Sequence, residues 1–177
     1  MVDLSKKVIH ALNNQISYEA YASNFYLALA FWCDDQGLQG CKQFFMRQSD
    51  EERMHMLKIF EYLSESGVYP TTPAIEQPPL SYDSIQEAFQ KVFEQERKVT
   101  NAIHEIVKLS DAEKDYNTLN FMQWYVEEQR EEEAVIRTIL DRIKVIGAGG
   151  QSLYYIDKEV EKINTGIVAA EAAEGEE

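Results

Sequence analysis

Four glutamates are the strongest candidates for a functional site in this sequence. Each is centred in the apolar stripe of its own helical segment; they are Glu19, Glu52, Glu96 and Glu132. Residues seven apart lie on one face of an α-helix, and each glutamate has apolar or aromatic residues at both offsets, as Glu52 has Phe45 and Ile59. An ionised carboxylate in a dry interior is costly unless something compensates its charge. Because no Lys or Arg stands in these stripes at the neighbouring turns, a polyvalent cation is the simplest compensation.

The second of these segments adds a nitrogen ligand. His55 follows Glu52 by three residues, so the imidazole and the carboxylate project into the same space. Glu-x-x-His at this spacing lets both side chains share one metal ion, and it is a ligand pattern of di-iron helical bundles. One such pattern often arises by chance, but three further glutamates on three other segments make it specific. Carboxylates with one nitrogen suit iron and manganese better than thiolate-preferring metals.

The segments that must position these side chains are predicted to be helices. Glycine and proline are rare and clustered, so the helix ends are easy to place. We predict helices over 5–34, 40–66, 83–109, 112–146 (or from 117) and a shorter 152–163, with Ser81 or Asp83 capping the third. Residues 68–82 hold all four prolines and form a long link.

This pattern predicts an all-α fold, a four-helix bundle with one long crossover and a short fifth C-terminal helix. Residues 1–164 would form this single domain. Residues 165–177 are small and acidic, and we expect them to form a mobile tail.

The charge balance limits the possible partners. Acidic residues outnumber basic ones by 31 to 17, for a formal net charge of −14. This disfavours a nucleic-acid partner, because phosphate binding needs concentrated Lys and Arg. It is compatible with cations as ligands and equally with solubility alone. No apolar run reaches the roughly 18 residues of a membrane span and no signal-peptide pattern is present, so we expect a cytoplasmic protein without membrane contact.

Four sequence segments also carry a family resemblance. In order they are YEAYASNFY, SDEERMHM, EQERKVTN and FMQWYVEEQREEE, and they resemble the metal-bearing segments of bacterial non-haem ferritins. The resemblance covers about residues 4 to 163 and implies a ferritin-like bundle. In it, Glu19, Glu52 and His55 would hold a first iron, and Glu52 would bridge to a second iron that Glu96 and Glu132 complete.

The resemblance implies roles for residues around that pair. Gln129 matches a glutamine that ferritins hold beside the site. Tyr26 matches a tyrosine close to the irons, which donates an electron or hydrogen-bonds a ligand; a merely buried tyrosine is the alternative. Glu51, Glu128 and Glu131, with Glu132, resemble a third iron position nearer the inner surface. For these acids the alternative is a solvated face.

The activity implied by the resemblance is that of a ferroxidase and a container. Paired Fe(II) would be oxidised to Fe(III) by O₂ or H₂O₂ at a di-iron centre, and the product stored as mineral in a homo-oligomeric cage of twenty-four subunits. No haem is expected, because haem binding through a methionine needs a symmetric dimer contact that the sequence does not reveal. The alternative is a non-storing di-iron redox enzyme, peroxide-scavenging and related to rubrerythrin. The absence of a CxxC pair and of a second Glu-x-x-His from the sequence speaks against it.

Overall fold

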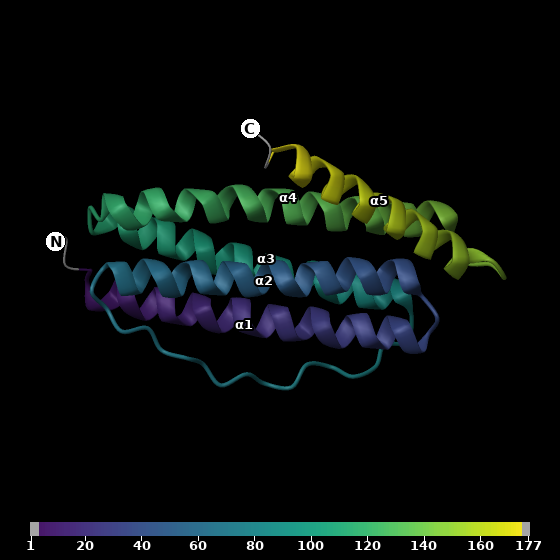
Figure 1. Ribbon diagram of the computed structural model, residues 1–177, viewed down its shortest axis with the longest axis horizontal. Coiled ribbons are helices and arrows are strands. Elements are labelled where there is room, and N and C mark those ends of the chain that lie inside the picture. The colour runs from purple at the N-terminus through teal and green to yellow at the C-terminus, as the bar shows by residue number, and fades with distance from the viewer. Residues whose placement is uncertain (1–3, 175–177) are drawn as a thin grey trace.

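A computed structural model describes residues 4–174 of the chain, and all regular secondary structure in that range is helical. The five helices are α1 (Lys6–Asp35), α2 (Gln39–Glu65), α3 (Ile85–Ala112), α4 (Tyr116–Ile146) and α5 (Ser152–Glu174). The first four form a bundle of long, nearly parallel rods, with α5 lying obliquely across α4 (Figure 1). The predicted fold class, a four-helix bundle followed by a fifth helix, is confirmed.

Two helical hairpins make up the bundle. The closest inter-helix packing is between α1 and α2 and between α3 and α4. Gly37, at φ 74°, ends the first helix in the left-handed conformation that glycine adopts without strain. The proline-rich link between α2 and α3 then runs the length of the bundle alongside α1 (Figure 1). This long link places the two hairpins side by side with one crossover, as the sequence predicted.

The start of α3 differs from the prediction. The N-cap is Ser84, whose hydroxyl accepts a hydrogen bond from the Glu87 amide at 3.1 Å. The Glu87 carboxylate in turn accepts the Asp83 amide at 2.7 Å. The Ser-x-x-Glu spacing is that of a capping box, although Glu87 accepts from the residue before the cap rather than from Ser84 itself. These two bonds explain why Ser84 caps the helix rather than Ser81 or Asp83.

The fifth helix is much longer than predicted. It continues past Ile163 to Glu174, so the expected domain boundary at residue 164 falls inside α5 and the segment 165–174 is helical. The physical reason is an apolar stripe at helical spacing that continues through Ile163 to Ile167, followed by alanines with high helix propensity. The last residues of the predicted acidic tail, 175–177, lie outside the described residues.

The apolar core is divided into two blocks along the bundle axis. The first block contains Phe25, Phe44, Phe45 and Phe89 and is joined by Ile156 and Val160 of α5. The second block is formed by α1–α4 alone; its buried members are Val8, Leu12, Ile16, Ile59, Leu63, Val99, Ile103, Ile106, Met122 and Tyr125. Between the two blocks lies a layer of buried polar side chains.

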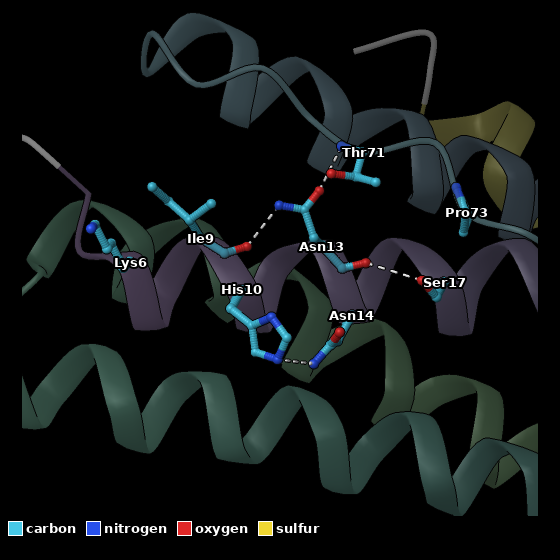
Figure 2. Close-up of a pocket in the computed structure, with 8 residues that line it drawn as sticks. All are labelled: Lys6, Ile9, His10, Asn13, Asn14, Ser17, Thr71 and Pro73. Atoms are coloured by element: carbon cyan, nitrogen blue, oxygen red, sulfur yellow. Dashed lines mark hydrogen bonds between the residues drawn. The ribbon is translucent and has the colours of Figure 1, made fainter.

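The side chain of Asn13 fastens the crossover link to α1. Asn13 donates to the Ile9 carbonyl at 2.9 Å and accepts the Thr71 backbone amide at 2.7 Å (Figure 2). A surface pocket of about 400 Å³ lies between α1 and the link. It shares no lining residue with the buried polar layer, so we assign it to the anchoring of the link.

Within residues 4–174, none of the helices combines the length and the hydropathy that crossing a lipid bilayer requires.

Candidate metal centre

The polar layer between the two apolar blocks brings together the five predicted ligands. Atoms of Glu19, Glu52 and His55 lie within 4.8 Å of one another, and so do carboxylate oxygens of Glu52, Glu96 and Glu132. The His55 Nδ1 lies 3.4 Å from Glu52 Oε2, 3.9 Å from Glu19 Oε2 and 4.0 Å from Glu132 Oε1. Glu52 belongs to both groups, so the arrangement offers two adjacent cation positions that share one carboxylate.

The hydrogen bonds leave specific carboxylate oxygens available. Both oxygens of Glu52 and one oxygen each of Glu19 and Glu132 are buried without a hydrogen-bond partner. The other Glu19 oxygen accepts from the Gln15 amide at 2.7 Å. Buried acceptors without a donor are costly. Their concentration in one layer therefore favours bound cations, which would satisfy these oxygens at the two adjacent positions.

Burial makes these carboxyl groups hard to ionise in the absence of a cation. It raises the pKa of Glu19 to about 7, and the hydrogen bond that Gln15 donates to Glu19 opposes that rise. The pKa values of Glu52 and Glu132 are raised well above their usual range by burial and then by neighbouring carboxylates. Four carboxyl groups in a dry layer repel one another once ionised. A metal ion reverses this penalty, and its binding releases protons.

His55 is a neutral imidazole. Burial, aided by the nearby Lys58 charge, lowers the pKa of His55 to about 4. Its close contacts with the carboxylates are therefore not ion pairs near neutral pH. A neutral imidazole has a nitrogen lone pair to offer a metal. The Trp124 ring packs edge-on against the imidazole at 5.2 Å between centroids and limits its rotation.

Glu96 is held from both sides. One oxygen accepts a short hydrogen bond from the Tyr26 hydroxyl, and the other accepts from the Gln129 amide at 3.0 Å. The structure thus brings both predicted neighbours to the ligand set, as the resemblance implied. Burial, followed by the charge of Glu96, raises the pKa of Tyr26 well above its usual value, so this hydroxyl acts as a donor.

The three remaining predicted acids lie beside the layer rather than in it. Glu51, Glu128 and Glu131 join Glu132 in lining a cavity of about 220 Å³ next to the ligand set. Glu131 is largely exposed and contacts Arg130 at 3.3 Å, whereas Glu51 is ion-paired with Arg47. The structure therefore brings these acids together at one position, and their role as ligands stays a prediction.

Two contacts of the site were missed from the sequence. Gln15 is fully buried and hydrogen-bonded to Glu19. Its position four residues before Glu19 in the same stripe was the available signal, since a polar residue there faces the same layer. Arg47 stands four residues before Glu51 and pairs with it, a spacing typical of helical ion pairs.

A bundle whose four helices each send one carboxylate into a shared buried layer, with one histidine, belongs to the class of carboxylate-rich helical bundles that can hold metal ions. Comparison with known proteins makes this specific. Residues 9–146 match the family model described as "Ferritin-like domain", and the chain belongs to the ferritin family.

Its relatives are of the bacterial non-haem type, as the four sequence segments predicted. The chain is 42% identical over 162 residues to a probable bacterial non-heme ferritin-like protein of Haemophilus influenzae, covering 92% of this chain and 98% of that protein. It is 40% identical over 160 residues to the bacterial non-heme ferritin of Campylobacter jejuni, covering 90% and 96%. Among solved structures, an open pore ferritin from Archaeoglobus fulgidus aligns with a TM-score of 0.88 at 42% identity, covering 91% of this chain and 98% of that one.

Proposed function

We propose that this protein stores and detoxifies iron, and that its buried layer is a ferroxidase centre that takes two Fe(II) ions as substrate. Membership of the ferritin family supports storage. The single observation that carries the catalytic assignment is the set of four orphaned carboxylate oxygens in the layer that contains His55.

The first iron would be held by Glu19, Glu52 and His55, and the second by Glu52, Glu96 and Glu132. Glu52 suits the bridging role because both of its oxygens lack hydrogen bonds. Tyr26 and Gln129 would position Glu96 through its two oxygens. Gln15 leaves Glu19 a single oxygen for the metal.

Each Fe(II) gives up one electron, so a pair supplies the two electrons that reduce O₂ to H₂O₂, or H₂O₂ to two waters, with uptake of two protons. Anionic oxygen ligands stabilise Fe(III) over Fe(II) and so favour the oxidation. Tyr26 and Gln129 already donate hydrogen bonds to both oxygens of Glu96, so the second position would hold its ferric product less firmly. Glu51, Glu128 and Glu131 would receive that product as a third position on the way to a mineral.

Storage requires a container, and we propose a homo-oligomeric cage of twenty-four copies, with a mass of about 490 kDa from twenty-four chains of 20.5 kDa. The likeness to an archaeal ferritin over nearly the whole of that chain supports a cage architecture. Exposed apolar side chains on α1 and on the crossover link, including Phe31 at 55% and Leu80 at 69%, supply surface for contacts between copies.

The test is an anaerobic Fe(II) titration of the size-fractionated protein, followed by air and ultraviolet absorbance. We expect two to three irons per subunit to be oxidised quickly, and then slower growth to hundreds of irons per particle. Glu52→Gln and His55→Ala should each lose at least about 90% of the fast phase, because each removes a proposed ligand. The control is Glu61→Gln, which changes an exposed acid of the same helix.

The outcomes separate the competing functions. Fast oxidation that stops at two irons in a small oligomer would replace storage by the non-storing di-iron redox enzyme. A fast phase that is unchanged in both Glu52→Gln and His55→Ala would refute the metal centre itself.

A further inference from the structure

The cavity beside the ligand set has an acidic floor and an apolar cover. Glu51 of α2 and Glu128, Glu131 and Glu132 of α4 line it from the bundle. Ile167 and Ala170, from the part of α5 beyond its predicted end, line it from the other side. An ion that leaves the buried layer on this side therefore enters a partly enclosed acidic space before it reaches solvent.

This cavity also contains a fixed positive charge. Arg47 lines it and forms an ion pair with Glu51, with side chains 15% and 21% exposed. Its Nε donates to Asn164 Oδ1 of α5 at 2.8 Å, and a terminal nitrogen donates to Gln48 Oε1 at 2.8 Å. A guanidinium is a permanent cation in proteins. It is therefore a resident cation, held in place from both α2 and α5.

We propose that Arg47 is a positioning residue that makes the acidic cavity a place of transit rather than of tight binding. Four carboxylates without a neighbouring cation would hold a ferric ion firmly. A guanidinium bonded to Glu51 removes one negative charge from the set and repels an incoming cation. An ion that uses Glu51 must first displace the guanidinium, so its dwell time falls. This role rests on the proposed function, because it presupposes that iron leaves the centre through this cavity.

Through Asn164, α5 helps to position the Arg47 guanidinium. The guanidinium is oriented toward Glu51 by donors that point in different directions, one of them to α5. Such a forked geometry is specific to arginine. Removing the Asn164 acceptor keeps the positive charge but lets the guanidinium move away from Glu51. Cation binding in the cavity should therefore become tighter, by less than when the charge itself is removed.

The experiment measures Zn(II), which binds such ligands without redox chemistry, by equilibrium dialysis and elemental analysis of the assembled protein. In Arg47→Gln, the weakest binding step should move to a free Zn(II) concentration about tenfold lower than in the unmodified protein, because a positive charge leaves the cavity. Arg47→Lys, which keeps the charge but loses the forked donors, should shift the same step by less than Arg47→Gln does. Asn164→Ala should shift the same step by about threefold.

The matched control is Arg53→Gln, which removes the same charge from an exposed position of the same helix. Coincident isotherms for Arg47→Gln and Arg53→Gln would overturn the proposal. If Arg47→Gln does not fold, as judged by circular dichroism, Asn164→Ala decides, and an unshifted isotherm there overturns it. Absence of Zn(II) binding to the unmodified protein, or of its Fe(II) oxidation, would instead contradict the proposed function.

Discussion

Single residues determine which carboxylate oxygens a cation meets. Gln15 occupies one oxygen of Glu19, and Tyr26 and Gln129 occupy both oxygens of Glu96, whereas Glu52 keeps both of its own unbonded. The second layer of amides and hydroxyls thus gives the four glutamates different roles although they share one environment.

The raised pKa of Glu19 gives a pH dependence to the stability of the metal-free protein. A carboxyl group with a pKa of 4.5 when unfolded and about 7 when folded stabilises the fold fully below pH 4.5, and this stabilisation is lost as the pH rises through 7. We expect the free energy of unfolding to fall by about 3 kcal/mol between pH 4.5 and pH 8 through this group. Denaturant unfolding at fixed protein concentration across that range measures the change.

The control for this pH dependence is Glu19→Gln, in which the amide cannot titrate. Its stability should depend less steeply on pH by about the same amount, and metal-saturated protein should show the opposite trend because binding needs ionised ligands. A stability that rises from pH 5 to pH 8 equally in both metal-free proteins would contradict the assignment.

For single residues, the sequence predicted the proposed ligands better than it predicted their hydrogen-bond partners. The helical stripes placed Glu19, Glu52 and Glu96 in the core because a period of 3.6 residues fixes which side chains share a face. Hydrogen bonds between helices depend on rotation and depth, which periodicity does not fix. The family resemblance placed Tyr26 close to the site without naming Glu96 as its partner, and the contact between Arg47 and Asn164 was not predicted at all.

Among the helices, the docking of α5 on α2 depends on an unusually close approach. The backbone amide of Cys41, in the first turn of α2, donates to the buried Asp157 carboxylate of α5 at 2.8 Å. Asp157 thereby serves as a helix cap from another helix, because the N-cap residue Leu38 makes no side-chain cap bond. Gly40 has no side chain to separate the two backbones.

Gly40→Ala should therefore weaken the packing of α5. A methyl group there would lie 2.8 Å from the Glu161 Cβ and also clash with the Asp157 backbone, so the two helices must move apart. We expect a loss of about 1–3 kcal/mol of stability and faster tryptic cleavage at Lys158 and Lys162. Gly150→Ala, where a methyl group meets nothing within 4 Å, is the control. Equal cleavage rates in the two variants would contradict this account.

The helix boundaries show where the sequence pattern was sufficient. The ends of α1 and α2 followed from glycines and lie within about a residue of prediction. The end of α5 did not, because the small and acidic composition of residues 165–177 predicted a mobile tail. The apolar stripe continues through Ile167, and the alanines that follow it favour a helix.

For the molecule as a whole, α1 presents apolar surface that one chain does not cover. Leu27 and Phe31, one helical turn apart, are 38% and 55% exposed, and the crossover link runs beside the same helix (Figure 1). In the proposed cage these side chains would lie between copies. Their exposure in a single chain is typical of an interaction surface.

The double substitution Leu27→Glu with Phe31→Glu should reduce assembly without unfolding the chain. Two buried like charges on each facing surface would repel at the contact, whereas both positions are exposed within one chain. Multi-angle light scattering should show the mass falling from about 490 kDa toward that of the 20.5 kDa chain or its small oligomers. The pair Leu27→Met with Phe31→Tyr keeps the surface apolar and should assemble normally. A full-mass particle from the glutamate variant would exclude this surface from the contacts.

The division of the core into two apolar blocks determines how the effects of substitutions on stability combine. Every long helix of the bundle passes from one block to the other through the polar layer, and the buried side chains of the two blocks pack as separate clusters. Distant sites without shared partners contribute additively to stability. A cavity made at Phe89 and another at Ile103 should therefore lower the free energy of unfolding by the sum of their separate effects. A cavity at either position combined with a substitution of a ligand in the polar layer should not be additive. The two ends of the bundle are thus free to vary independently, and the centre is the part of the chain where sequence changes must be coordinated.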